Sequence, residues 1–309
     1  MIIHDGYKDI KLISPVVTLG IFDGVHRGHQ DLLGHLVSRA KEINGESVVI
    51  TFDPHPRLVL DKNRNELSFL TTMDEKKTLL GNAGIDHVII IRFTPEFSRM
   101  NACDFVKEVL VQKIGTSYLV VGYDHHFGKD GGGNFDTIKE CAASFGFSVG
   151  QVQGFKTEEG AISSSIIRDA LLKGKLDDAN RLLGYNYSLR GSIVKGRRIG
   201  RMLGFPTANI KPDYQYKLIP GDGVYAVGVQ IDRFWLKGML SIGKNPTVSS
   251  ASGSRSIEVN IFDFEKDIYG KEIKVVFRSR LRDEIKFDSI EQLARQMELD
   301  REHATRLLT

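Results

Sequence analysis

The chain of 309 residues lacks most features that would place it in a membrane, outside the cell or on nucleic acid. Its two cysteines, Cys103 and Cys141, are too few for the disulfide framework of a small secreted domain. No apolar run approaches the roughly 18 residues of a membrane span, and the first residues do not resemble a secretory signal. The net charge of +3 comes without a long Lys/Arg cluster, which fits small anionic ligands better than nucleic acid. We therefore expect a cytoplasmic protein with neither nucleic-acid nor membrane partners.

What the chain does contain is enough apolar sequence for two domains. Hydrophobic residues make up 41% and charged residues 26%, as in globular proteins, and the length allows two separate cores. In the first part, the apolar runs 16–19, 48–52, 87–93 and 118–122 alternate with stretches of helical spacing. This alternation predicts an α/β fold with a doubly wound parallel sheet, which binds ligands at the carboxyl ends of its strands.

The pattern changes at Gly184. Short strand-like runs follow one another from residue 187 to 277, separated by Gly, Asp, Asn or Pro turns, which favours an antiparallel barrel or sandwich. A last helix is expected from Asp288 or Ser289, where Gln292 would complete a capping box, so that one helix closes a β domain. We expect domains over residues 1–184 and 185–309.

The most distinctive stretch of the first part is residues 18–29, where a buried strand turns into a helix. Its three glycines follow neither the dinucleotide pattern nor the P-loop pattern. His26 and His29 lie three residues apart at the helix start, so both rings can point to one side. Because a helix N-terminus attracts anions, the corner predicts a triphosphate site. A plain surface turn and half of a metal site are the alternatives.

Other segments are expected near the same sheet edge. Two prolines in residues 53–56 fix a loop after the second strand, and residues 122–133 form a glycine-rich loop that carries an acid, two histidines and an aromatic ring. Residues 163–165 are three serines at a helix start, and Arg168 follows on the first turns. Serines can simply cap a helix, but serines together with an arginine favour phosphate binding.

A second candidate site lies in residues 196–210, where three arginines precede Pro-Thr-Ala-Asn. Thr207 and Asn209 are two residues apart, so on an extended segment their oxygens face one side. Such a pair could share a Mg²⁺ ion with the phosphates of ATP. A polar turn is the alternative.

Together these motifs resemble those of the bacterial bifunctional riboflavin kinase and FMN adenylyltransferase (FAD synthetase) family. Residues 20–29 look like its nucleotide-binding motif, residues 163–168 are similar to its Ser-Ser-Thr-x-Ile-Arg segment, and residues 196–209 resemble its riboflavin kinase motif. The match extends over nearly the whole chain. It implies that ATP phosphorylates riboflavin to FMN in the second domain and adenylylates FMN to FAD in the first, with release of pyrophosphate.

For the first domain, the resemblance implies that His26, His29 and Arg168 neutralise the phosphates of ATP. The FMN phosphate is already an anion, so this reaction needs no general base. The first-domain residues expected to bind the nucleotide are Gly20, Phe22, Asp23, Gly24, Gly28, Ser164 and Ser165. Those expected to bind the flavin there are Asp124 and Phe127.

For the second domain, the resemblance implies that Glu258 accepts the proton of the ribityl hydroxyl and that Thr207 and Asn209 hold Mg²⁺. The remaining residues expected at the kinase nucleotide are Gly196, Arg201, Gly204 and Pro206. Those expected at its flavin are Asn245 and Arg282.

Two other functions stay open on the sequence. One is a nucleotidyltransferase for a different phosphate ester, against which the Pro-Thr-Ala-Asn segment argues. The other is a non-catalytic flavin-binding regulator, against which Glu258 argues. An oligomer is possible.

Overall fold

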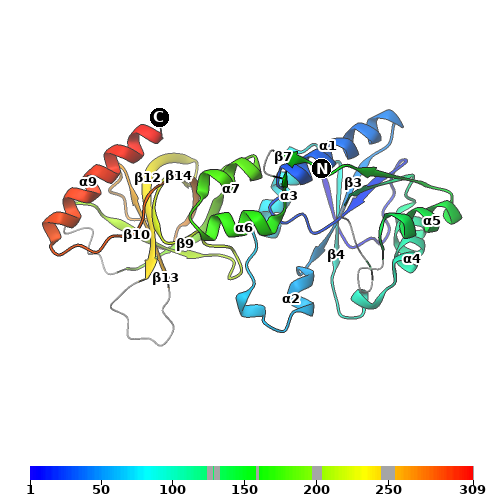
Figure 1. Cartoon of the computed structure of the whole chain (residues 1–309), viewed down its shortest axis with the longest axis horizontal. Coiled ribbons are helices and arrows are strands. Elements are labelled where there is room, and N and C mark those ends of the chain that lie inside the picture. The colour runs from blue at the N-terminus through cyan, green and yellow to red at the C-terminus, as the bar shows by residue number, and fades with distance from the viewer. Residues whose placement is uncertain (124–127, 129–132, 158–159, 197–203, 245–254, 309) are drawn as a thin grey trace. The chain divides into compact units, whose positions relative to one another are not determined.

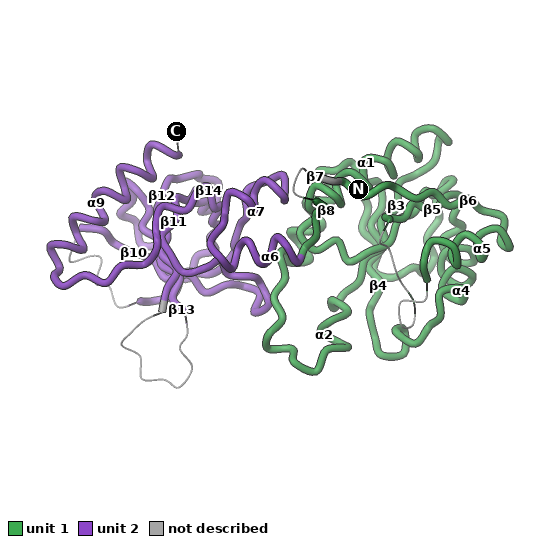
Figure 2. The backbone as a smooth tube through the Cα atoms, in the orientation of Figure 1, with its two compact units in different colours: residues 1–164 green, residues 165–309 purple. Residues whose placement is uncertain are grey.

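The computed structural model describes residues 1–123, 128, 133–157, 160–196, 204–244 and 255–308. The chain forms two compact units, residues 1–164 and 165–309 (Figure 2). This division comes earlier in the chain than the change from helical to strand patterning at Gly184, where we expected the domain boundary.

Unit 1 is built on a six-stranded sheet in the order β1-β4-β3-β2-β5-β6, in which every pair of neighbours is parallel. The strands are β1 (Ile2–Asp5), β2 (Val16–Leu19), β3 (Ser47–Asp53), β4 (His87–Arg92), β5 (Tyr118–Gly122) and β6 (Ser148–Val152). The inner strands β2 and β3 are apolar on both faces, as strands covered on both sides must be. The predicted parallel sheet is confirmed.

Helices cover both faces of this sheet (Figure 1). The covering helices are α1 (Arg27–Glu42), α3 (Met73–Asn82), α4 (Ala102–Phe105), the π-helical η3 (Val106–Ile114) and α5 (Phe135–Phe145). The short α2 (Pro56–Leu60) buries no residue, and the 3₁₀ turns η1 (Arg64–Glu66) and η2 (Phe97–Arg99) lie in the connections. Successive residues of β3 point to opposite faces of the sheet and pack in two separate hydrophobic clusters. Val48 and Ile50 pack with η3 and α5, whereas Val49 packs with α1 and α3. The sheet is therefore doubly wound, with α1 and α3 on the same face.

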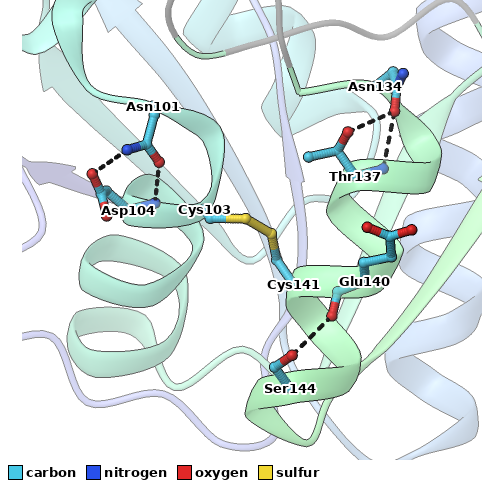
Figure 3. The surroundings of a disulfide bond; sticks show 8 residues. All are labelled: Asn101, Cys103, Asp104, Asn134, Thr137, Glu140, Cys141 and Ser144. Carbon is cyan, nitrogen blue, oxygen red and sulfur yellow. Dashed lines mark hydrogen bonds between the residues drawn. A yellow bond between two sulfur atoms is a disulfide. The ribbon is translucent and has the colours of Figure 1, made fainter.

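The two cysteines form a single disulfide bond in unit 1 (Figure 3). Cys103 on α4 and Cys141 on α5 have Cα atoms 5.8 Å apart. Both helices begin at asparagine caps, Asn101 and Asn134, whose side chains accept hydrogen bonds from backbone N–H groups of the first turn. The bond thus joins two helices that share one hydrophobic cluster.

Unit 2 is a closed six-stranded antiparallel barrel in the order β10-β13-β12-β11-β14-β9, which confirms the predicted barrel. Its strands are β9 (Ser188–Val194), β10 (Thr207–Pro212), β11 (Gly223–Ile231), β12 (Phe234–Lys244), β13 (Arg255–Ile261) and β14 (Glu272–Arg282). A small hairpin, β7 (Lys156–Thr157) and β8 (Gly160–Ala161), belongs to unit 1. On β13 the buried Ile257 and Val259 flank the more exposed Glu258, as the alternation of a barrel strand requires.

Helix α9 (Ile290–Leu307) closes the barrel where the sequence predicted, with Ser289 as its N-cap. Its Ala304 and Met297 pack in a cluster with Phe205, Met239 and Phe262 of the barrel unit.

Two further helices, α6 (Ser164–Leu172) and α7 (Leu176–Leu183), belong almost entirely to unit 2. The Asn180 amide donates to the carbonyl oxygen of Phe277 on β14, and its oxygen accepts from the backbone N–H of Tyr187. The N–H of Gly221 donates to the carbonyl of Leu171. These bonds explain why residues 165–184 group with the barrel.

Candidate active sites

The phosphate-binding corner of the sequence lies where β2 gives way to α1. His26 is the N-cap of α1, and its Nδ1 accepts the backbone N–H of His29 at 3.3 Å. The two imidazole rings stack with centroids 3.7 Å apart. A Cβ at Gly28 would lie 3.4 Å from the His26 ring, so the backbone of Gly28 packs close beside the imidazole. Because Nδ1 accepts this hydrogen bond, Nε2 is the nitrogen of His26 that carries the ring proton.

The residues just before His26 hold the corner in place. Phe22 is buried, and its ring meets that of His29 edge-on at 5.1 Å. The Asp23 carboxylate is 5% exposed and accepts the backbone N–H groups of Leu70 at 2.9 Å and Thr71 at 3.1 Å. The Thr71 hydroxyl in turn accepts the N–H of Gly24 at 3.1 Å. Asp23 and Gly24, expected at the nucleotide, thus tie the corner to residues 70–71.

Of the other residues expected at this site, Gly20 and Ser164 belong to unit 1, whereas Ser165 and Arg168 belong to unit 2. The N–H of Gly20 donates to the carbonyl of Ile50. The Ser164 hydroxyl donates to the carbonyl of Asp23 at 2.9 Å, so the structure joins Ser164 to the corner within unit 1. Ser165 and Arg168 belong to unit 2, where the Arg168 guanidinium donates to the Ser165 hydroxyl at 3.1 Å. Their contact with a nucleotide stays a prediction.

His29 is a neutral side chain in this environment. Burial, and then the nearby charges of His26 and Lys76, lower the pKa of His29 well below its ordinary 6.5. Its Nδ1 is buried and has no hydrogen-bond partner among the described residues. At neutral pH the ring can therefore donate a hydrogen bond to a phosphate but supplies no net positive charge of its own.

Lys76 on α3 is a charged residue that the sequence analysis missed. It is 5% exposed, and its Nζ donates to the Thr51 hydroxyl at 3.4 Å. Burial lowers the pKa of Lys76 from its ordinary 10.5 to about 8, although the charges of Asp23 and Asp53 act in the opposite direction. One signal was available, since Lys76 lies four residues before Leu80 and therefore on the buried face of α3.

In unit 2, β10 and β13 bring the expected kinase residues together. The strand register sets Asn209 opposite Glu258, and the Thr207 hydroxyl donates to the Glu258 carboxylate at 3.1 Å. Gly196 lies directly against Asn209, because a Cβ at Gly196 would overlap the Asn209 amide. The geometry therefore gathers four residues that span positions 196 to 258 of the sequence.

The oxygen donors of Thr207 and Asn209 fit a Mg²⁺ ion that takes its other ligands from phosphates and water. Within the described ranges, no group of three or more His, Cys, Asp or Glu side chains is arranged to hold a metal ion. The described residues therefore contain no metal site built from three or more such side chains. Pro206, next to Thr207, accepts the Asn260 amide at its carbonyl, 2.8 Å away, which fixes the start of β10.

The remaining expected residues are less informative. Arg282 forms a two-pronged ion pair with Asp300 of α9, at 2.7 and 3.0 Å, and Asp300 is 5% exposed. Its contact with flavin stays a prediction. Gly204 is exposed and has a φ of +79°, which suits glycine. The residues expected at the ligands that lie outside the described part of the chain are Asp124, Phe127, Arg201 and Asn245.

No helix in the described ranges is both long enough and apolar enough to span a membrane.

Comparison with known proteins agrees with the two-part organisation. The family model for FAD synthetase matches residues 10–166, and the family model for riboflavin kinase matches residues 183–308. A bifunctional riboflavin kinase/FMN adenylyltransferase from Listeria monocytogenes is 39% identical over 293 residues, which cover 93% of this chain and 90% of the relative. The protein of that name from Escherichia coli K12 is 35% identical over 286 residues, which cover 92% and 90%.

Among solved structures, a crystal structure described as a macrolide-efflux protein from Streptococcus pneumoniae has a TM-score of 0.89 and 34% identity, with 98% of each chain covered. The likeness thus spans both units. With two matching family models and relatives matched over nine-tenths of their length, the chain belongs to the bifunctional riboflavin kinase/FMN adenylyltransferase family.

Proposed function

We propose that this chain makes FAD from riboflavin in two ATP-dependent steps. The barrel phosphorylates riboflavin to FMN, and the sheet unit adenylylates FMN to FAD with release of pyrophosphate. The observation that carries the proposal is the hydrogen bond between Thr207 and Glu258 in one unit together with the stacked His26 and His29 in the other. Because both reactions consume ATP, we place the protein in the cytoplasm.

In the kinase reaction, Glu258 accepts the proton of the ribityl hydroxyl as the hydroxyl oxygen attacks the γ-phosphorus of ATP. The hydrogen bond from Thr207 orients the carboxylate, and the antiparallel pairing of β10 and β13 holds both side chains on rigid strands. Mg²⁺, held by Thr207 and Asn209, would spread the negative charge of the transferred phosphoryl group. ADP leaves.

In the adenylyl transfer, a phosphate oxygen of FMN attacks the α-phosphorus of ATP, and the bond to pyrophosphate breaks. The Nε2–H of His26 and the ring N–H of His29 donate to phosphate oxygens at the N-terminus of α1, where the helix dipole favours negative charge. Arg168 keeps the phosphate-binding role that the family motif gives it. A neutral His29 leaves positive charge to be supplied by other residues.

Product analysis tests this function directly. The purified full-length chain is given riboflavin, ATP and Mg²⁺, and flavins are separated by chromatography over time. We expect FMN to appear first and FAD to follow, with one pyrophosphate for each FAD. A chain that makes only FMN, or that binds flavin without converting it, would contradict one or both assignments.

A further inference from the structure

A buried lysine beside the stacked histidines has almost no partner. Lys76 has three N–H donors, yet within the described part of the chain its Nζ has one hydrogen bond, the 3.4 Å contact with the Thr51 hydroxyl. No carboxylate oxygen of the described residues lies within 4 Å of it. A lysine this deeply buried is rare unless it is paired, because an ammonium that loses its water needs hydrogen-bond acceptors in its place.

The local structure holds this lysine firmly. Helix α3 begins with a capping box, in which Thr72 and Glu75 each accept a backbone N–H of the other at 3.2 and 2.9 Å. The backbone N–H of Lys76 donates to the carbonyl of Thr72. The side chain therefore leaves a rigid first turn and reaches Thr51 near the carboxyl end of β3.

This end of β3 adjoins the phosphate-binding corner. The Thr51 hydroxyl donates to the carbonyl of Ile21 at 3.3 Å, so Lys76, Thr51 and the corner form one connected group. His29 belongs to it as well, because the charge of Lys76 contributes to lowering the pKa of His29. Among the described residues, Nζ of Lys76 has one hydrogen bond and the buried Nδ1 of His29 has none, and both atoms occur in the region where the proposed function needs a triphosphate.

We propose that Lys76 is a further catalytic residue of the adenylyl transfer, whose ammonium binds an oxygen of the ATP triphosphate beside His29. The role rests on the proposed function. As the FMN oxygen bonds to the α-phosphorus, the bond from that phosphorus to the pyrophosphate oxygen breaks, and pyrophosphate leaves with the electron pair. Lys76 keeps its proton throughout and stabilises the charge that collects on the leaving group. It supplies the positive charge that a neutral His29 does not.

The competing interpretation is that Lys76 is a structural counter-ion for Asp23. The Asp23 carboxylate already accepts hydrogen bonds from the backbone of Leu70 and Thr71 and from the Thr71 hydroxyl. It therefore does not need the lysine as a partner. The other nearby carboxylate, Asp53, is exposed at the end of β3 and is hydrated by solvent.

The matched test uses two neighbouring lysines of α3 in the full-length chain. Lys76→Met removes the buried ammonium, and Lys77→Met removes the same charge from a side chain that pairs at the surface with Asp74, 3.3 Å away. We expect Lys76→Met to lower FAD formation from supplied FMN by roughly a hundredfold or more, with FMN formation from riboflavin unchanged. Lys77→Met should leave both activities within about twofold of the parent.

A pH profile separates catalysis from a purely structural role. The titratable groups around Lys76 are Asp23, Asp53 and His29, with His26 stacked on His29. With a pKa of about 8, the Lys76 side chain of the enzyme without bound ATP loses its proton above that pH. We therefore expect kcat/KM for ATP in FAD formation to fall up to tenfold for each pH unit above 8. Lys76→Arg keeps a permanent charge and should abolish this fall. This variant tests the role even if Lys76→Met does not fold.

The outcomes are distinct. If Lys76→Met forms FAD within threefold of Lys77→Met, the catalytic role is wrong while the proposed function stands. If Lys76→Arg shows the same decline above pH 8 as the parent, Lys76 is not the titrating group and the role is likewise wrong. If the parent chain makes no FAD at all, the proposed adenylyltransferase and the role of Lys76 fall together.

Discussion

Replacing Lys76 by methionine should make unit 1 more stable even though it removes FAD synthesis. Burying Lys76 as a cation lowers the free energy of unfolding, because its pKa drops from 10.5 to about 8 in the folded protein. At about 1.36 kcal/mol for each pH unit, this difference corresponds to about 3 kcal/mol of lost stability at pH 7. Methionine has a similar length, carries no charge and fills the same space.

The sign follows from proton binding. Below pH 8 both the folded and the unfolded parent hold the proton of Lys76, so the full penalty is present. Between about pH 8 and 10.5 the unfolded chain binds more protons, so the free energy of unfolding of the parent rises with pH. Lys76→Met lacks this rise. The attraction of Asp23 and Asp53 is already contained in the pKa, and Thr51 keeps its hydrogen bond to Ile21.

Urea denaturation of the full-length parent, Lys76→Met and Lys77→Met at pH 7 and pH 9.5 measures this effect on the transition of unit 1. We expect Lys76→Met to gain about 1 to 3 kcal/mol over the parent at pH 7 and less at pH 9.5. Lys77→Met, being a surface change, should stay within about 0.5 kcal/mol of the parent. A Lys76→Met protein that is less stable than the parent at pH 7 would refute the reasoning and make Lys76 a structural residue.

Three further variants test other parts of the molecule. The double variant His26→Ala, His29→Ala should abolish FAD formation and spare FMN formation; equal loss of both in a folded protein would contradict the division of labour. Glu258→Gln should slow riboflavin phosphorylation by roughly a hundred to ten thousandfold in a steady-state assay, and a loss below threefold would mean that another group is the base. Asp300→Ala removes the carboxylate partner of Arg282, which keeps its hydrogen bond to the Asp283 carbonyl, and should destabilise the barrel by about 3 kcal/mol in urea, whereas a neutral result would show that water replaces the carboxylate.

The overall architecture could be predicted because it depends on local patterns. Strands such as β2 and β3 are apolar on both faces, and only a sheet covered on both sides accommodates them. The short, turn-separated strands of the second half likewise leave few alternatives to a barrel.

The grouping of α6 and α7 could not be predicted in the same way. Their spacing shows that one face of each helix is buried but not which surface covers it. The decisive contacts are long-range, such as the bond from Asn180 to Phe277, which lies 97 residues later in the chain. Helical spacing placed the expected domain boundary at Gly184, next to residue 183, where the riboflavin kinase family model begins, whereas the compact units divide after residue 164.

The two candidate sites show the same limit. The family motifs supplied His26, His29, Thr207 and Glu258, but the closeness of Thr207 and Glu258 depends on the register of β10 against β13, which no local pattern specifies. Lys76 was missed because lysines on amphipathic helices are ordinarily solvated. Its burial follows from the way α3 packs on the sheet, and only its spacing to Leu80 hinted at it.

The bond between Cys103 and Cys141 turns residues 103–141 into a covalent ring. The ring contains β5 and the two residues expected at the flavin of the first unit, Asp124 and Phe127. A protease that cuts once inside the ring nicks the chain without separating it, so the two fragments migrate as one species until a reductant is added. A single cut between residues 103 and 141 therefore separates the two fragments only on a reducing gel.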